Sequence, residues 1–325
     1  MRLAGASVAG PPRVQQVLDD VPPASGAVVM GSGILCVDLY AVGQPEVAAV
    51  LLWFAAGTWL FLAAVLALRV LNEPGRFARE ARSPPALTGV AGTGVLGTAF
   101  AAHGYYLAAA ALLGLAVISW ALLLTPVLRH RETPVPGESF LLTVATQGLA
   151  VLGATLAARN GAAWLLIAAI AAAVLGLALY IVTVTRFALR QLLTGHGDQW
   201  IAGGALAISA LACAKITKAD DALGRFASLH GFLDVGALVL WCLAMLWLGP
   251  LIAAEALRPR LSYDVRRWAT VFPLGMYAAC SFAVGQVTGI CGIGIFARVW
   301  TWVAATVSLF VLVGLIRRSW HVLLG

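Results

Sequence analysis

Ten apolar stretches, each long enough to cross a lipid bilayer as an α-helix, dominate this sequence of 325 residues. A helix needs about 20 apolar residues to span the hydrocarbon core. Only 11% of the residues are charged, whereas soluble domains carry about a quarter. The sequence therefore predicts an all-α integral membrane protein. The expected spans are residues 22–40, 46–70, 85–102, 105–128, 138–157, 162–185, 199–216, 229–255, 268–289 and 295–316.

The spans divide the chain into three parts. We expect residues 1–21 to be an N-terminal tail, residues 22–316 to be a ten-helix transporter or channel domain, and residues 317–325 to be a C-terminal tail. The apolar run in the first part is too short and too weak for the core of a signal peptide.

Lysine and arginine are distributed unequally between the two sides of the membrane. The two tails and the connections after the second, fourth, sixth and eighth spans carry 16 of them, and the opposite side carries five. Because basic residues collect in cytoplasmic loops, both termini are predicted in the cytoplasm of a multi-pass cell (plasma) membrane protein. These loops also account for the net charge of +7, so nucleic acid is not an expected partner.

Tryptophan and glycine separate the odd spans from the even ones. Eight of the eleven tryptophans lie in even spans, whereas odd spans hold fourteen glycines against seven in even spans. Bulky aromatic helices suit lipid, and small residues suit close packing or the walls of a conduit. We predict five helical hairpins, with the odd helices forming an inner pore ring and the even helices an outer ring. Helix packing without a pore is the alternative explanation for the glycines.

Small and polar residues of the odd spans are the candidates for the pore wall. Hydroxyl and amide groups can replace part of the hydration of an ion, although many hydroxyls bond to their own helix instead. Prolines near the starts of these spans favour bent helices and cavities. The candidates are Gly31, Gly33, Gly94, Thr146, Gln147, Gly203, Gly204, Pro273 and Gly275.

Phe272 in the ninth span is the predicted pore gate. It precedes Pro273, and proline bends a helix and frees a backbone carbonyl, which can tilt the neighbouring side chain inward. An aromatic ring across a narrow apolar pore blocks water and ions. Phe282 is the rival candidate, and ordinary packing is the alternative for either ring.

Charged residues are scarce inside the odd spans, and none lies at mid-depth. This favours a channel-like path over a proton-coupled carrier, which usually needs a buried carboxylate or histidine relay. Asp38 and Asp234, near the outer ends of their spans, are most simply a structural pair. Lys215 and Lys218 are expected to attract anions to an outer vestibule.

Cysteines and histidines give no sign of a metal, cofactor or catalytic site. The five cysteines form no CxxC pair, and the five histidines lie at or outside the span ends. A haem protein or membrane enzyme would need paired histidines or a carboxylate cluster within the membrane. We therefore expect no enzyme activity, no cofactor and no bound metal.

Short motifs from the first span to the ninth resemble the tellurite-resistance/dicarboxylate transporter family. This group includes bacterial TehA, fungal malate and sulfite transporters and plant slow anion channels. The order and spacing of the motifs, together with ten spans, carry the resemblance. The matching pieces are Pro22-Pro23, Val28 to Ile34, Thr146 to Val151, Trp200 to Ile208, Trp241 with Pro250, and Trp268 to Gly275.

The resemblance implies five hairpins around a central pore, a homotrimer, and an anion path gated by a phenylalanine that corresponds to Phe272. The expected substrates are small anions: a C4-dicarboxylate such as malate, sulfite, or inorganic anions. A membrane-embedded enzyme or haem protein and a non-transporting membrane subunit are the alternative functions.

Overall fold

The structure, a computed structural model, describes residues 21–130, 135–194, 197–225, 230–259 and 264–324. Ten helices in these ranges are long and apolar enough to cross a membrane. Across the same ranges the only β-structure is an isolated bridge between Val135 and Phe187. The prediction of an all-α integral membrane protein with ten spans is confirmed.

The ten long helices alternate along the chain between two sets. We call the first set the inner helices: α2 (Gly26–Ala41), α5 (Leu87–Ala102), α7 (Leu141–Asn160), α10 (Trp200–Leu223) and α12 (Trp268–Thr288). The second set, the outer helices, comprises α3 (Pro45–Asn72), α6 (Tyr106–Arg129), α8 (Ala163–Val184), α11 (His230–Leu257) and α13 (Cys291–Leu324). Two short helices, α4 (Pro74–Glu80) and α9 (Gln191–Thr194), lie in the connections.

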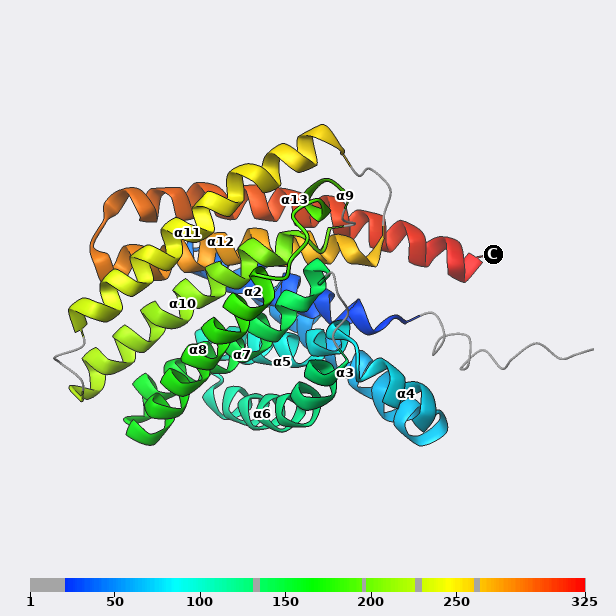
Figure 1. The fold of residues 1–325 in the computed structure, drawn as a ribbon, viewed down its shortest axis with the longest axis horizontal. Helices are drawn as coiled ribbons and strands as arrows, with labels where there is room; N and C mark the ends of the chain where they lie inside the picture. Colours follow the sequence, from blue (N-terminus) through cyan, green and yellow to red (C-terminus); the bar gives the residue numbers. More distant parts are fainter. Residues whose placement is uncertain (1–20, 131–134, 195–196, 226–229, 260–263, 325) are drawn as a thin grey trace, which may run out of the picture.

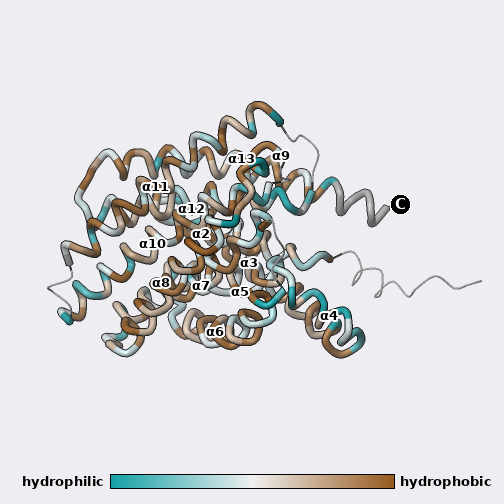
Figure 2. The backbone as a smooth tube through the Cα atoms, viewed as in Figure 1, coloured by the Kyte–Doolittle hydropathy of each residue, from teal (hydrophilic) through white to brown (hydrophobic). Residues whose placement is uncertain are grey.

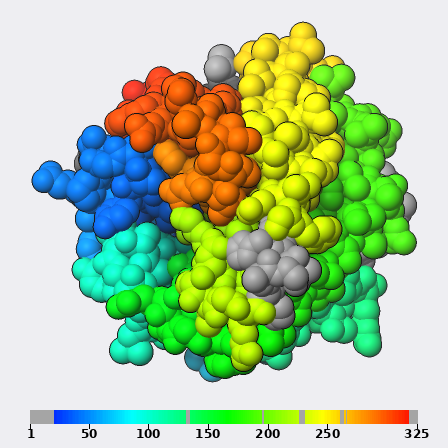
Figure 3. All heavy atoms as spheres, turned by 90° about the vertical axis from the view of Figure 1, so that its left-hand side faces the viewer, coloured from blue at the N-terminus to red at the C-terminus, as the bar shows by residue number. Residues whose placement is uncertain are grey.

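The inner helices contact one another in cyclic order, because α2, α5, α7, α10 and α12 each pack on the next and α12 packs on α2. Each outer helix packs on the inner helix before it and on the inner helix that follows, with α13 reaching back to α2. The long helices lie side by side in Figure 1. Figure 3 looks onto their ends, where the hairpins follow one another around the molecule in sequence order.

Burial separates the two sets of helices clearly. In the most apolar stretch of each inner span, 67–94% of the residues are buried, against 11–33% in the outer spans. Hydrophobic residues cover the outer helices along most of their length (Figure 2). An exposed apolar surface of this length is what contact with lipid requires.

Three tryptophan side chains of outer helices donate a hydrogen bond to a hydroxyl group on the inner helix of the next hairpin. Each acceptor hydroxyl in turn donates to the carbonyl four residues earlier in its own helix. In each case the indole N–H and the hydroxyl group both have a hydrogen-bond partner away from water. The pairs are Trp59 Nε1 to Thr93 Oγ1 at 2.9 Å, Trp120 Nε1 to Thr146 Oγ1 at 2.9 Å, and Trp241 Nε1 to Ser281 Oγ at 2.7 Å.

Short 3₁₀ turns precede four of the inner helices. They are η1 (Pro23–Ser25), η2 (Pro84–Ala86), η3 (Gly137–Phe140) and η5 (Val265–Arg267). Proline occupies the first or second position of η1 and η2, and Pro136 precedes η3. Proline suits these positions because its fixed φ fits a first helical turn, where its missing N–H has no intrahelical acceptor.

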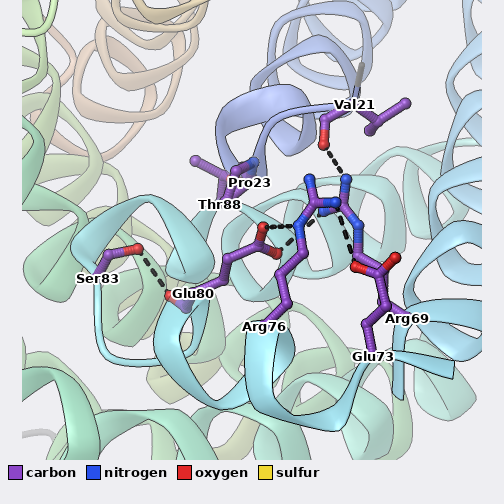
Figure 4. A network of polar contacts seen from close by, with 8 residues as sticks. All are labelled: Val21, Pro23, Arg69, Glu73, Arg76, Glu80, Ser83 and Thr88. Atoms are coloured by element: carbon purple, nitrogen blue, oxygen red, sulfur yellow. Dashed lines mark hydrogen bonds and ion pairs between the residues drawn. The ribbon is translucent and has the colours of Figure 1, made fainter. Parts of the chain in front are cut away.

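A buried arginine ties the start of α2 to the first outer helix (Figure 4). Arg69 in α3 is 3% exposed, donates to the Val21 carbonyl and pairs with Glu80 of α4 at 3.1 Å. Thr88 in α5 donates to the Pro23 carbonyl at 2.9 Å. Together these contacts fix the segment before α2 against α3, α4 and α5.

Candidate ion pathway

A cavity of about 220 Å³ lies where the inner helices begin. All five inner helices, or the turns directly before them, contribute to its wall. Because the inner helices contact one another in a closed cycle, a cavity that the starts of all of them line lies at one end of that cycle. The lining residues are Ala24, Ala27, Met30, Pro85, Thr88, Pro136, Glu138, Leu141, Asp198, Ile201, Arg266, Ala269 and Phe272.

The lining residues of α2 and α12 are spaced three residues apart along the chain. In α2 and the turn before it they are Ala24, Ala27 and Met30, and Ala269 and Phe272 follow the same interval in α12. Residues three or four apart lie on one face of a helix. One face of α2 and one face of α12 therefore line the cavity.

Phe272 lies at the deep end of the cavity. It is the lining residue furthest along α12, and its side chain is only 1% exposed. Met30 takes the equivalent place on α2 and is also buried. The structure thus places the predicted gate residue against the internal cavity, and gating itself stays a prediction.

Three charged residues, Glu138, Asp198 and Arg266, lie at the mouth of the cavity. Arg266 pairs with Asp264 at 2.9 Å, and this hydrogen bond raises the pKa of its guanidinium further. Asp198 accepts a hydrogen bond of 3.1 Å from the Gly137 N–H. The sequence did not single out these three residues, because they lie at or before the starts of the spans and no motif relates them to one another.

Most of the candidate pore glycines pack helices together. A Cβ atom at Gly33 would come 3.0 Å from Val95 of α5, and one at Gly204 would come 3.0 Å from Pro273 of α12. The packing interpretation of the glycine bias therefore accounts for these positions. Three further glycines also allow a close contact between helices: Gly31 lies against Trp268, Gly203 against Tyr277 and Gly275 against Ile34.

Two polar candidates, Thr146 and Gln147, form hydrogen bonds with outer helices. Thr146 accepts the hydrogen bond from Trp120 of α6. Gln147 donates from Nε2 to the Ala173 carbonyl of α8 at 3.0 Å. Both side chains are therefore held by outer helices.

Gly148 was not among the candidates, yet it faces open space. It is buried, and a Cβ built on it would meet no atom within 4 Å. Because Thr146 and Gln147 face the outer helices, the opposite face of α7 faces the ring interior, and Gly148 lies on that face. Seven residues separate it from Leu141 of the cavity wall, which is about 10 Å along the helix. A Cβ built on Gly94 of α5 would come 3.5 Å from the Gly148 backbone.

The two lysines predicted for an outer vestibule lie near the C-terminal end of α10. Lys218 is exposed and donates to Gln286 of α12. Lys215 is half-buried on the helix face that carries Ile201 of the cavity wall. Asp38 and Asp234 do not form the expected pair, because Asp38 lies against Gly275 of α12 and Asp234 interacts with Cys213 of α10.

Metal-ligating side chains do not cluster in the part of the chain that the structure describes. Within it, no group of three or more histidines, cysteines and acidic residues is arranged to hold a metal ion.

Two curated proteins similar to part of this chain are membrane proteins. The uncharacterized membrane protein MT1776 of Mycobacterium tuberculosis (strain CDC 1551 / Oshkosh) is 34% identical over 91 residues, which are 26% of this chain and 46% of that protein. The same values hold for the uncharacterized membrane protein Rv1735c of strain H37Rv. The chain thus spans less than half the length of these two relatives.

The family comparison covers almost the whole membrane region. The model of the voltage-dependent anion channel family matches residues 20–316, which reach from before the first span to the last turn of the tenth. This match confirms the resemblance drawn from the short motifs. The chain belongs to the voltage-dependent anion channel family.

Proposed function

We propose that this protein conducts small anions across the cell membrane through the ring of inner helices, with Phe272 as the gate. Family membership supports anion transport as the general activity. The observation that carries the finer proposal is the cavity, because all five inner helices line it and Phe272 lies at its deep end. A benzyl group there excludes water and ions from a narrow apolar passage.

Weak binding along the passage suits rapid anion flow. The deeper part of the cavity wall is apolar, with Ala27, Met30, Ile201 and Ala269 beside Phe272. Conduction requires an ion to enter and also to leave, which a tight charged site would prevent. Lys215 and Lys218 supply two positive charges at the other end of the ring, whereas the charge of Arg266 at the mouth is balanced by Asp264.

The proposed substrates are small anions such as C4-dicarboxylates, sulfite and inorganic anions. We also propose a homotrimer with both termini in the cytoplasm, which would open the cavity to the cytoplasmic side. Lysine and arginine placement supports this orientation. The trimer rests on the family resemblance.

Anion flux through reconstituted protein tests the gate. Phe272→Ala is expected to raise anion current in liposomes well above that of the unmodified protein, because it removes the ring at the end of the cavity. Phe282→Ala is the matched control, since Phe282 is half-buried in the same helix and does not line the cavity.

Two outcomes would count against the proposal in different ways. Equal currents from Phe272→Ala and the unmodified protein would show that Phe272 is not the gate. A complete lack of flux from every variant, across a panel of anions, would favour a non-transporting membrane subunit.

A further inference from the structure

Asp38 of α2 is a buried carboxyl group without a hydrogen-bond donor. The residue is 0% exposed. Neither of its side-chain oxygens has a hydrogen-bond partner among the residues that the structure describes. Buried polar groups are nearly always paired, so this exception requires an explanation.

Asp38 lies on the helix face that lines the cavity. It follows Ala27 by eleven residues, which is close to three full turns, so the two side chains share one face of α2. A Cβ built at Gly275 of α12 would come 3.2 Å from Asp38 Oδ2. Gly275 follows Phe272 by three residues, so Asp38 lies at the contact between α2 and α12, about one turn beyond the proposed gate.

Neutral groups surround the carboxyl group on its own helix and on α12. Ile34 shares the contact with Gly275. The thiols of Cys36 and Cys280 lie close enough to interact with it electrostatically. Thiols are ordinarily uncharged at pH 7. The Tyr277 hydroxyl is already committed, because it donates to the Ala244 carbonyl at 3.0 Å.

The other helices packed on α2 bring no charged partner to Asp38 within the described residues. On α3, Glu46 is exposed and Arg69 pairs with Glu80, and on α13, Arg298 is exposed. At the end of α5, the His103 ring packs at a tilt against Tyr40 with the ring centroids 4.7 Å apart, and its Nδ1 lies 4.0 Å from Cys36 Sγ. On η5, Arg266 pairs with Asp264 and Arg267 pairs with Glu255.

An ionised carboxylate is costly in these surroundings. Removing its charge from water without a donor or a counter-ion is much less favourable than binding a proton. Water that enters the ring would reverse this balance by hydrating the carboxylate. The charge of Asp38 is therefore linked to the state of the passage beside it.

We propose that Asp38 is a proton-binding site of the anion passage, and that anions pass only while Asp38 is protonated. A carboxylate at this position repels an anion, whereas the neutral acid does not. Anion flux then rises as the pH falls. This inference rests on the proposed function and adds a proton-controlled step to it.

Flux measurements over about pH 5 to 8 test the proposal. Equal pH on both sides of the liposome membrane removes any driving force from a proton gradient. Flux through the unmodified protein is expected to fall at least about tenfold from the acidic to the alkaline end. Asp38→Asn, which is always neutral, is expected to hold the acidic level throughout, and Asp38→Glu is expected to retain the pH dependence.

Matched controls identify the titrating group. Cys280→Ser and His103→Gln are expected to keep the pH dependence, because neither removes the Asp38 carboxyl group. The infrared C=O band of a protonated carboxyl group is expected in the unmodified protein and absent from Asp38→Asn.

The other possible outcomes would contradict either the role of Asp38 or the proposed function itself. A pH-independent flux in the unmodified protein, or an unaltered pH profile in Asp38→Asn, excludes Asp38 as the controlling group. Asp38 is also excluded as the controlling group if the folded Asp38→Asn variant conducts no anions at any pH. It is likewise excluded if this variant retains the infrared band. Absence of flux from every variant would instead contradict the proposed function.

Discussion

Gly204 of α10 lies directly against the pyrrolidine ring of Pro273 in α12, where a Cβ would come 3.0 Å from the ring carbons Cβ and Cγ. Pro273 adjoins Phe272, so this contact holds the proposed gate against the neighbouring inner helix. Gly204→Ala is expected to push α12 away and to destabilise the protein by about 1–3 kcal/mol, the usual cost of overpacking. Thermal unfolding in detergent measures the change, and an unaltered melting temperature would show that the two helices adjust freely.

Gly148 of α7 provides the opposite test, because a Cβ there would meet no atom within 4 Å. Gly148→Ala is expected to leave stability unchanged or to raise it by up to about 1 kcal/mol, since alanine is the better helix former. Anion flux is expected to fall, because the added methyl group narrows the space inside the ring. A variant with unchanged flux would indicate that Gly148 faces a closed void instead of the passage.

The hydrogen bond between Trp241 of α11 and Ser281 of α12, at 2.7 Å, is expected to stabilise the contact between these helices. Trp241→Phe and Ser281→Ala should each cost about 1 kcal/mol, which is typical of a single hydrogen bond. The double variant should cost clearly less than the sum, because both substitutions remove the same bond. Trp164→Phe is the control, since Trp164 is 71% exposed. Strict additivity in this cycle would mean that the bond contributes nothing.

Span number and position were predictable because apolar length is a direct consequence of the bilayer thickness. The end of α10 was less predictable. The sequence indicated an end near residue 216, where Lys215, Lys218 and Asp220 begin to appear, whereas the helix continues to Leu223. Hydropathy detects the apolar part of a helix only, and the helix itself ends at Gly224, whose φ of +61° suits glycine.

The pore wall was less predictable than the spans, because glycine has two uses that composition does not distinguish. A Cβ at Gly94 would contact the Gly148 backbone, whereas a Cβ at Gly148 would face open space. Thr146 and Gln147 likewise have the polarity of pore residues but serve contacts with outer helices. The direction of a side chain depends on how a helix is rotated within the ring, and all-apolar neighbours leave that rotation undetermined in the sequence.

Arg69 offers a test of how the cavity mouth is held in place. Its guanidinium is buried, pairs with Glu80 and donates to the Val21 carbonyl before α2. Arg69→Met is expected to destabilise the protein by about 1–3 kcal/mol, because it leaves the Val21 carbonyl without its buried donor and leaves Glu80 with only its ion pair to Arg76. The matched control is Arg266→Met, whose ion pair with Asp264 is exposed and is expected to contribute less than about 1 kcal/mol. Chemical unfolding in detergent compares the two variants. Equal losses of stability would show that the buried Arg69 contacts stabilise the protein no more than the exposed Arg266 ion pair does. A large loss confined to Arg69→Met would identify the Arg69 contacts as those that hold the start of α2 in place.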